Sequence, residues 1–292
     1  MVDDTPLPVA RPALLELGHT ITRSYKEANY TWRLIDNQYW QIETPASTPM
    51  VTKETSARCP ADMVEVQGSY LVGPDGKDNG TIGEWQDRAC SKWRGKRVCE
   101  VYDEPKWASL RQRGKAKPMH VCVDRYEYPN RQGEYPMVVV SYTEAKQLCK
   151  RQNKRLCSES EWTFACEGPD ALPYPYGYTR DAEACTIDIT TQVLADDALW
   201  PRNTGRAVRG IDKAFHGTPS GSRAACKSPF GVYDMTGNLD EWTESTGGGR
   251  YPSILKGGFW SKVRARCRPS TRAHGPVFVT YETGFRCCAD PS

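Results

Sequence analysis

Residues 237–243 read Gly-Asn-Leu-Asp-Glu-Trp-Thr, and two more short motifs follow: residues 256–260 read Lys-Gly-Gly-Phe-Trp, and residues 283–287 read Thr-Gly-Phe-Arg-Cys. Amphipathic helices and strands require only a spacing of apolar residues, so no common element demands this order of Gly, Trp, Arg and Cys. The order of the three motifs is therefore the most specific signal in the chain.

The three motifs resemble the signature of the formylglycine-generating enzyme (sulfatase-modifying factor) family, a branch of the C-type-lectin-like fold. Residues 154–157, 161–162, 166–168 and 230–235 also resemble the family, so the likeness extends over roughly residues 59–290. The resemblance implies an α+β fold: a compact, disulfide-rich domain with two helices, short twisted sheets and much irregular structure.

The chain divides near residue 56. Residues 1–56 are rich in Pro and Thr and contain a short aromatic patch. We expect them to form an N-terminal extension or docking arm that packs on the main domain or on a partner; a linker and a small β-hairpin are the alternatives. Residues 57–292 form the expected main domain, similar to formylglycine-generating enzymes.

The cysteine content points to an oxidising compartment. The chain has twelve cysteines, an even number, and only four histidines. Zinc sites would need closely spaced cysteine pairs with histidines nearby, so disulfide bonds are the better explanation, with reduced or metal-bound thiols as the alternative. We therefore expect an extracytoplasmic protein, secreted or periplasmic, although no signal peptide is visible at the start of this chain.

Charge and hydropathy exclude several classes of protein. The net charge of +3 is nearly balanced and does not indicate a nucleic-acid-binding protein. No apolar run approaches the roughly 18 residues that a membrane helix needs, so we expect no membrane span. The longest run, residues 137–140, is typical of a strand.

Local patterns predict several elements of the main domain. Residues 141–144 and 158–161 are capping boxes, each followed by apolar residues and a cysteine at helical spacing, so each predicts a helix with a cysteine facing inward. Alternating apolar residues predict strands at residues 63–66 and 119–126. The polar stretch 73–118 predicts loops held by its two cysteines.

The resemblance also implies one disulfide bond. In the family, the cysteine at the end of the second helix bonds to the cysteine after Gly-Phe-Arg, which implies a Cys166–Cys287 bridge here. Such a bridge would close a loop of more than a hundred residues, worth about 4–5 kcal/mol in the chain-entropy account. Cys149 is then left with Cys288 or Cys157 as its partner.

The residues at the catalytic positions argue against copper chemistry. The family's catalysts look like copper oxidases that use two cysteines after the Gly-Gly segment, because paired thiolates suit Cu(I). The resemblance places the second cysteine at Cys267 but the first at Lys262, the family's active-site Ser at Phe259 and its His at Val263. A lysine ammonium cannot replace a thiolate. The sequence favours a non-catalytic role; a copper-dependent oxidase with an altered active site is the alternative.

Calcium is the metal that the resemblance favours. The family's Gly-Asn-x-x-Glu-Trp-Thr loop carries a structural calcium site, which implies side-chain ligands from Asn238 and Glu241 and backbone oxygens from Leu239 and Thr243. Oxygen ligands from a loop suit a hard cation. The alternative is a turn held by hydrogen bonds of the Asn and Glu side chains without a metal.

Iron is disfavoured. Another branch of the family oxidises sulfur substrates at an iron site held by three histidines. The histidines of this chain are isolated and lack the helical spacing of such a site; they are His19, His120, His216 and His274.

A basic segment lies near the end of the chain. Its cations alternate with small or apolar residues and are Lys262, Arg264, Arg266 and Arg268. In a strand, this period would put all four on one face, and no acid lies between residues 245 and 281. The four residues are candidates for anion binding, since guanidinium groups match planar anions. The alternative is that acids from elsewhere in the fold pair with the arginines.

These observations predict a non-catalytic extracytoplasmic binding or assembly module that recognises a protein partner or an anionic ligand. A third possibility, besides the oxidase, is a structural subunit of a larger extracytoplasmic complex that docks through residues 1–56.

Overall fold

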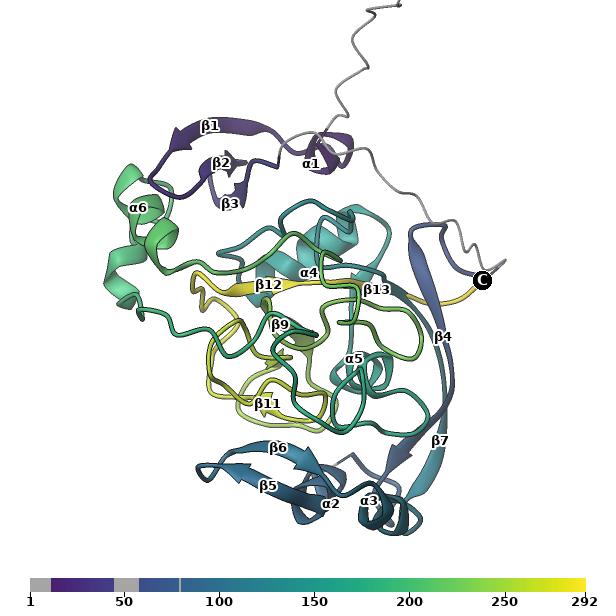
Figure 1. Cartoon of the computed structure of the whole chain (residues 1–292). Helices are drawn as coiled ribbons and strands as arrows, with labels where there is room; N and C mark the ends of the chain where they lie inside the picture. The colour runs from purple at the N-terminus through teal and green to yellow at the C-terminus, as the bar shows by residue number, and fades with distance from the viewer. Residues whose placement is uncertain (1–11, 45–57, 79) are drawn as a thin grey trace, which may run out of the picture.

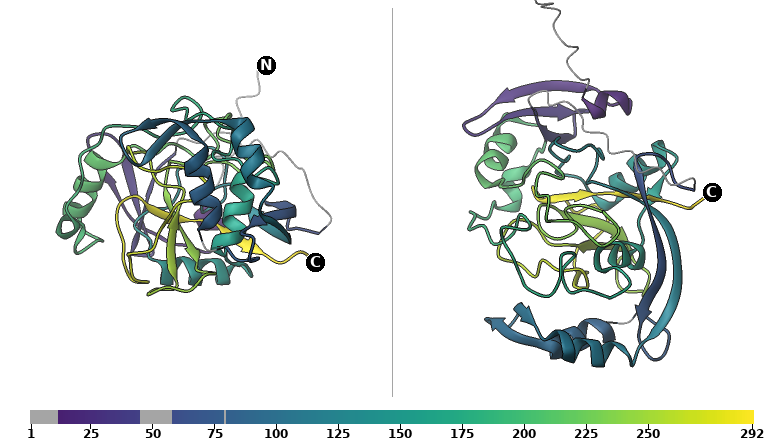
Figure 2. Two further views of the ribbon diagram at one scale, coloured as in Figure 1. Left: turned by 90° about the horizontal axis from the view of Figure 1, so that it is seen from below. Right: turned by 45° about the vertical axis from the view of Figure 1, so that its right-hand side comes forward.

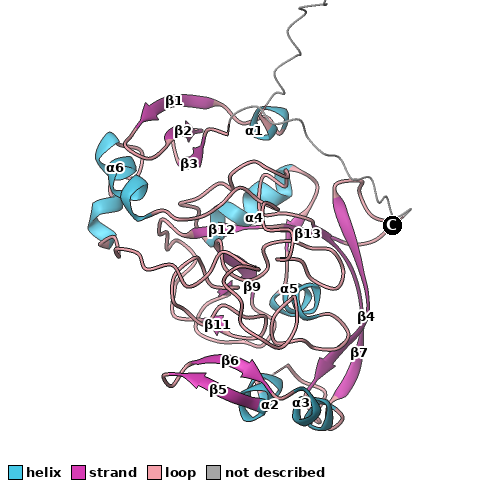
Figure 3. Cartoon of the chain, viewed as in Figure 1, coloured by secondary structure: helices cyan, strands magenta, loops and turns pink. Residues whose placement is uncertain are grey.

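The computed structural model describes residues 12–44, 58–78 and 80–292 (Figure 1). Within these ranges the chain forms six α-helices, one 3-10 helix and thirteen mostly short strands. Loops make up much of the centre of the molecule, as Figure 3 shows. The expected fold class, an α+β domain with short sheets and much irregular structure, is confirmed, but the described residues contain more helices than the two expected.

The outer wall is a long antiparallel strand pair. β4 (Met63–Val72) and β7 (Lys115–Asp124) pair along their whole length, which confirms and extends the two predicted strands. β13 (Cys287–Ala289) continues this sheet beside β7, and β8 (Arg155–Leu156) lies at its edge. Alternate residues of β4 and β7 pack on the core beneath them.

The two predicted helices form where their capping boxes place them. α4 (Tyr142–Arg151) begins after Ser141, and α5 (Glu159–Glu167) begins after Ser158; each serine accepts the N3 backbone N–H, and the N3 glutamate reaches back. Each helix buries its cysteine completely. The two helices thus each bring a cysteine sulfur into the core, Cys149 from α4 and Cys166 from α5.

The stretch between β4 and β7 is more regular than predicted. It contains α2 (Thr81–Ala89), the hairpin β5 (Cys90–Arg94) and β6 (Val98–Tyr102), and α3 (Glu104–Arg111). The prediction of loops was wrong because both helices have an apolar face that packs on one cluster; its large members include Ile82, Trp85, Trp107 and Tyr174. The Cys90–Cys99 disulfide joins the two strands of the hairpin.

A second sheet carries the three signature motifs. Its strands, in spatial order, are β11 (Ser270–Thr271), β10 (Ser253–Lys256), β9 (Asp240–Glu244) and β12 (Thr283–Phe285). β12 runs parallel to β9, so the Asn-Leu-Asp-Glu-Trp and Gly-Phe-Arg motifs lie side by side. The Lys-Gly-Gly motif follows directly where β10 ends. The three motifs therefore lie on, or at the ends of, strands of one sheet.

The N-terminal segment packs on the main domain. Its described part forms α1 (Ala13–Glu16) and the meander β1 (Ile21–Lys26), β2 (Thr31–Ile35) and β3 (Tyr39–Ile42). The meander covers α6 (Gly205–Ala214), which follows η1 (Asp196–Leu199), and lies at the opposite end of the molecule from the β5–β6 hairpin (Figures 1 and 2). Residues 1–11 and 45–56 of the expected arm lie outside the described residues.

Polar and apolar contacts fix the meander in place. Trp32 and Trp40 are fully buried in a cluster that includes Phe215 and Trp260 of the main domain. The Asp212 carboxylate on α6 accepts the Trp32 indole N–H at 2.9 Å and two backbone N–H groups of the β1–β2 turn. The described part of the N-terminal segment therefore shares its core with the main domain. Among the described residues, no helix is both long enough and apolar enough to cross a membrane.

Candidate functional site

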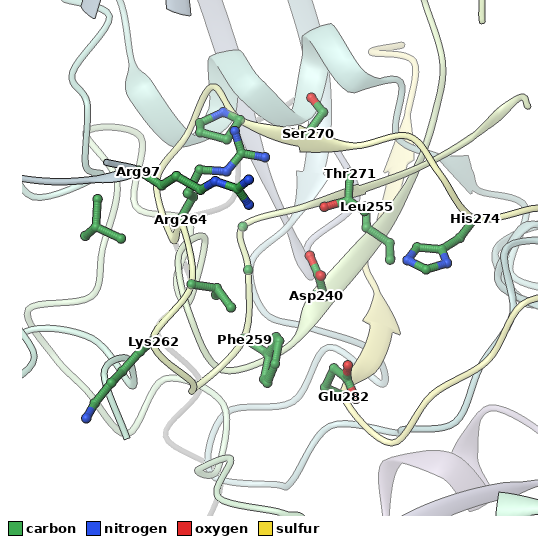
Figure 4. A pocket seen from close by; sticks show the side chains of 15 residues that line it. Arg97, Asp240, Leu255, Phe259, Lys262, Arg264, Ser270, Thr271, His274 and Glu282 are labelled. Carbon is green, nitrogen blue, oxygen red and sulfur yellow. The ribbon is translucent and has the colours of Figure 1, made fainter. Parts of the chain in front are cut away.

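A pocket of about 400 Å³ opens beside the Gly-Gly motif. Its lining comes from the turn of the β5–β6 hairpin, from the strand ends of the second sheet and from the segment 257–264. Figure 4 shows Arg97 and Arg264 on one side of this pocket, with Asp240, Glu282 and His274 on the other. Residues from four distant parts of the chain thus meet in one cavity.

Two glycines shape the wall of the pocket. Gly257 and Gly258 have φ angles of 87° and 71°, in the left-handed region that favours glycine. A Cβ at Gly258 would also lie 2.9 Å from the Val263 side chain. The Gly-Gly motif is therefore needed to turn the chain sharply from β10 into the segment that lines the pocket.

Cys267 is bonded to Cys166 and is completely buried. The predicted Cys166–Cys287 bridge is wrong, as are both partners considered for Cys149. All twelve cysteines are paired. The pairs are Cys59–Cys122, Cys90–Cys99, Cys149–Cys287, Cys157–Cys288, Cys166–Cys267 and Cys185–Cys226.

The pairing of β13 with β8 explains this connectivity. Consecutive residues of a strand point to opposite faces, so Cys287 and Cys288 face different parts of the core. Cys287 faces the cluster beneath α4, where Cys149 lies, and Cys288 faces the cluster that contains Cys157. Cys166 on α5 then pairs with Cys267, which lies in the segment after the Gly-Gly motif.

The basic segment is not a strand. Residues 262–268 form an irregular loop, and the last four of its residues are buried, so the expected alternation between a cationic and an apolar face is absent. Arg266 donates to the Asp87 carboxylate at 2.6 Å and to the Tyr102 hydroxyl. Its guanidinium is therefore held by acid and phenol groups from the 73–118 region.

Arg268 lies deeper than Arg266. It makes a two-point ion pair with the Glu167 carboxylate at the end of α5, one contact being 2.6 Å, and also donates to the Leu71 carbonyl at 2.8 Å. Its side chain is 5% exposed and that of Glu167 is fully buried. The alternative considered from sequence, in which acids elsewhere in the fold pair with the arginines, holds for Arg266 and Arg268.

Three other cations remain accessible. Lys262 and Arg264 of the loop and Arg97 of the hairpin turn are exposed and line the pocket. None of the three has a hydrogen bond or ion pair with another residue in the part of the chain that the structure describes. The free positive charge at this pocket thus comes from two segments, and Arg97 was not among the residues predicted from sequence.

Two carboxylates on the other side of the pocket were also missed. Asp240 begins β9 and Glu282 directly precedes β12; the Asp240 N–H donates to the Glu282 carbonyl at 3.0 Å. Burial raises the pKa of Asp240 to about 8, and the nearby charge of Glu282 acts in the same direction. Asp240 lies inside the first signature motif, but only the parallel pairing of β9 with β12 brings Glu282 next to it.

A profile of the sulfatase-modifying factor enzyme 1-like domain matches residues 77–291. The chain belongs to this family. Among its relatives, "Inactive C-alpha-formylglycine-generating enzyme 2" of Bos taurus is 30% identical over 168 residues, covering 53% of this chain and 50% of the relative. "Formylglycine-generating enzyme" of Mus musculus is 27% identical over 176 residues, covering 53% of this chain and 44% of the relative. The chain spans about half the length of these relatives.

A solved structure agrees with the fold. The crystal structure of CarF superposes with a TM-score of 0.51 at 15% sequence identity and covers 80% of this chain and 99% of that one. At this identity the likeness supports the sulfatase-modifying factor fold alone.

The positions that the resemblance aligns with the family's copper site do not fit copper. Lys262 is exposed and offers an ammonium, while Cys267 is buried in its disulfide with Cys166. Phe259 and Val263 line the same pocket but carry no donor atom in their side chains. Cu(I) prefers soft thiolate ligands, and none of these side chains offers one.

The residues of the predicted calcium loop are engaged in protein contacts. The Asn238 side chain accepts the Thr218 N–H at 2.8 Å and donates to the Glu127 carboxylate at 2.6 Å. Both oxygens of Glu241 accept hydrogen bonds from Arg286, at 2.6 and 2.7 Å.

Leu239 donates its backbone N–H to Glu127, and Thr243 lies within β9, opposite Ile254 of β10. A calcium ion would have to compete with Arg286 for Glu241, so the contacts favour the turn held by hydrogen bonds. Calcium binding stays a prediction of the family resemblance alone.

Three of the four histidines have different contact partners. His19 contacts Asp36 and Tyr128, and His120 contacts Glu65. His274 lines the pocket and stacks on Phe278 with 3.8 Å between ring centroids. Among the described residues no cluster of three His, Cys, Asp or Glu side chains has the arrangement of a metal site.

Proposed function

We propose that this chain is a non-catalytic binding module of the sulfatase-modifying factor family that works in an oxidising, extracytoplasmic compartment. One observation carries the proposal: Cys267 is bonded to Cys166, and Lys262 stands where a second thiol is needed. A pair of thiolates for Cu(I) is therefore absent from the pocket that the resemblance identifies with the catalytic site.

Two further observations support the proposal. The Bos taurus relative is described as inactive, and this chain covers half of the length of that relative. Six disulfides bond all twelve cysteines, which is typical of proteins that mature outside the cytosol, in secreted or periplasmic locations.

The pocket supports recognition of an anionic ligand or an anionic group of a partner protein. Arg97, Lys262 and Arg264 present charge without an internal partner, so they can bind an anion without first giving up an ion pair. Arg266 and Arg268 already have acidic partners and belong to the framework that supports the pocket.

The absence of catalysis is tested by copper titration and oxygen uptake. The full chain, kept oxidised, is incubated with Cu(I) and a cysteine-containing sulfatase peptide. We expect no tight copper binding and no conversion of the cysteine. Turnover that depends on Cys267 would overturn the proposal.

Anion binding is tested with sulfate, phosphate and a capped glutamate peptide as probes. Arg264→Ala is expected to weaken binding about tenfold or more, since a charge-assisted hydrogen bond is lost. Lys213→Ala, which removes an exposed cation from α6, is the matched control and is expected to change nothing. Equal binding by both variants would refute an anion site at this pocket.

A further inference from the structure

The acidic side of the pocket has a defined architecture. β10 pairs with β9 so that Leu255 lies opposite Trp242, which puts Asp240 and Leu255 on the same face of the sheet. The Gly258 N–H donates to the Asp240 carboxyl group, and the Thr280 hydroxyl donates to Glu282 at 2.6 Å. Both carboxyl groups are therefore held by the backbone turns that build the pocket.

The sheet cation that acts on Asp240 does not line the pocket. This cation is Lys256. It pairs with Glu241 across β10 and β9, so its side chain lies on the face of the sheet opposite to Asp240. Its ammonium donates to the Arg268 carbonyl at 3.0 Å. Glu241 adds a further negative charge near Asp240. His274 is the other titratable group that lines this side.

The basic side is fixed independently. Arg97 projects from the hairpin whose strands are joined by Cys90–Cys99. Arg97 and Arg264 also lie against the same small hollow beside the pocket. Arg264 is followed by Arg266, which is tied to Asp87, and by the buried Cys267. Each side of the pocket therefore has its own rigid support.

We propose that the pocket binds a zwitterionic ligand, whose anionic group is held by Arg97 and Arg264 and whose cationic group is held by Asp240 and Glu282. This inference rests on the proposed function and adds a cationic group to the ligand. A pocket of about 400 Å³ has the size of small-ligand sites. A free amino acid and a peptide segment with neighbouring acidic and basic side chains share this chemistry.

Charge complementarity explains why both groups are needed. An anion alone would be attracted by the arginines but would leave the two carboxyl groups without a ligand, whereas a zwitterion offers each side of the pocket a group of complementary charge. A bound ammonium also favours the ionised form of Asp240, whose pKa is raised to about 8 by burial and by Glu282. Binding of the cationic group should therefore release protons, and the affinity should rise as the pH rises from about 7 to 9.

Calorimetric titration of the full, oxidised chain tests the inference. The peptide probes are capped and place one glutamate and one lysine at increasing separations with alanine spacers; matched peptides carry the glutamate alone or the lysine alone. Free glutamate and free lysine distinguish a small zwitterion from a peptide segment. We expect at least one zwitterionic probe to bind about tenfold more tightly than the glutamate-only peptide, with proton release.

Two variants separate this inference from the proposed function. Asp240→Asn is expected to remove the preference for the zwitterion and the proton release while binding of the glutamate-only peptide persists or strengthens. Arg264→Ala is expected to weaken both kinds of probe. If the glutamate-only peptide binds as well as every zwitterion and Asp240→Asn changes nothing, the zwitterion is refuted and the anion site stands. If no probe responds to Arg264→Ala, both are refuted.

Discussion

The guanidinium of Arg286 forms a two-point ion pair with the carboxylate of Glu241, and both side chains are completely buried. Glu241 belongs to the first signature motif and Arg286 to the last. The Trp162 indole N–H donates to the same carboxylate at 2.9 Å, so α5 is joined to the pair. The ion pair explains why these motifs occur together: each supplies the charge that the other needs in the core.

Removing Arg286 should be strongly destabilising. Arg286→Met would leave Glu241 buried next to Glu127 and Asp234 without a compensating charge, so we expect a loss of about 3–5 kcal/mol in the free energy of unfolding. Denaturant unfolding of the oxidised protein measures it. Arg264→Met, which removes an exposed arginine, is the control and should stay within about 0.5 kcal/mol.

A double-mutant cycle tests the pair itself. The double variant Glu241→Gln/Arg286→Met should lose less free energy of unfolding than the two single variants added together. Each single change leaves the charge of the other residue buried without its partner, and the second change removes that charge. Additive losses would contradict the direct coupling of the two side chains.

The Cys166–Cys267 bridge should be detectable and stabilising. It spans 101 residues of sequence, and replacing both cysteines by alanine should cost about 2–5 kcal/mol. Peptide mapping under non-reducing conditions should recover the two cysteines in one linked fragment. A fragment that links Cys166 to Cys287 would show instead that the pairing expected from the family resemblance is right.

The ionisation of Asp240 should make the protein less stable as the pH rises. Burial raises its pKa from 3.8 to about 8, so the folded protein binds this proton more tightly than the unfolded chain does. Asp240→Asn should therefore change nothing below about pH 4 and raise the melting temperature progressively up to about pH 8, by about 2–4 °C for each kcal/mol gained. Thermal unfolding across this range measures the difference. A gain that is independent of pH would contradict the assignment.

Elemental analysis decides whether the Asn238 loop holds calcium. With Glu241 bound to Arg286, we expect less than one calcium per chain and no change in melting temperature on treatment with EDTA. One bound calcium per chain that is lost in Asn238→Ala would instead establish the metal site that the family resemblance implies.

Local sequence signals located several elements well. The capping boxes at Ser141 and Ser158 predicted the starts of α4 and α5, because their hydrogen bonds involve residues only three positions apart. The alternation near residue 63 located β4. α2 was missed although Ile82, Trp85 and Ala89 have helical spacing, because the surrounding residues are polar.

The contacts of the site depend on residues far apart in the chain. Arg268 is buried because Glu167 lies at the end of α5, and nothing in the basic segment itself distinguishes it from the exposed Arg264. The choice between Cys287 and Cys288 as a partner depends on which face of β13 each occupies. The pocket's acids meet only when β12 pairs with β9. Such relationships require the tertiary fold, so sequence pattern alone could not supply them.

The shared core beneath the N-terminal meander has a practical consequence for any shortened version of this protein. A chain that starts at residue 57 would retain every signature motif, yet it would leave Phe215 and Val138 without the indoles that cover them. Asp212 would lose the N–H donors that now surround its carboxylate. A shortened version should therefore keep the meander, because a truncation chosen from the motifs alone would expose an apolar surface that favours aggregation.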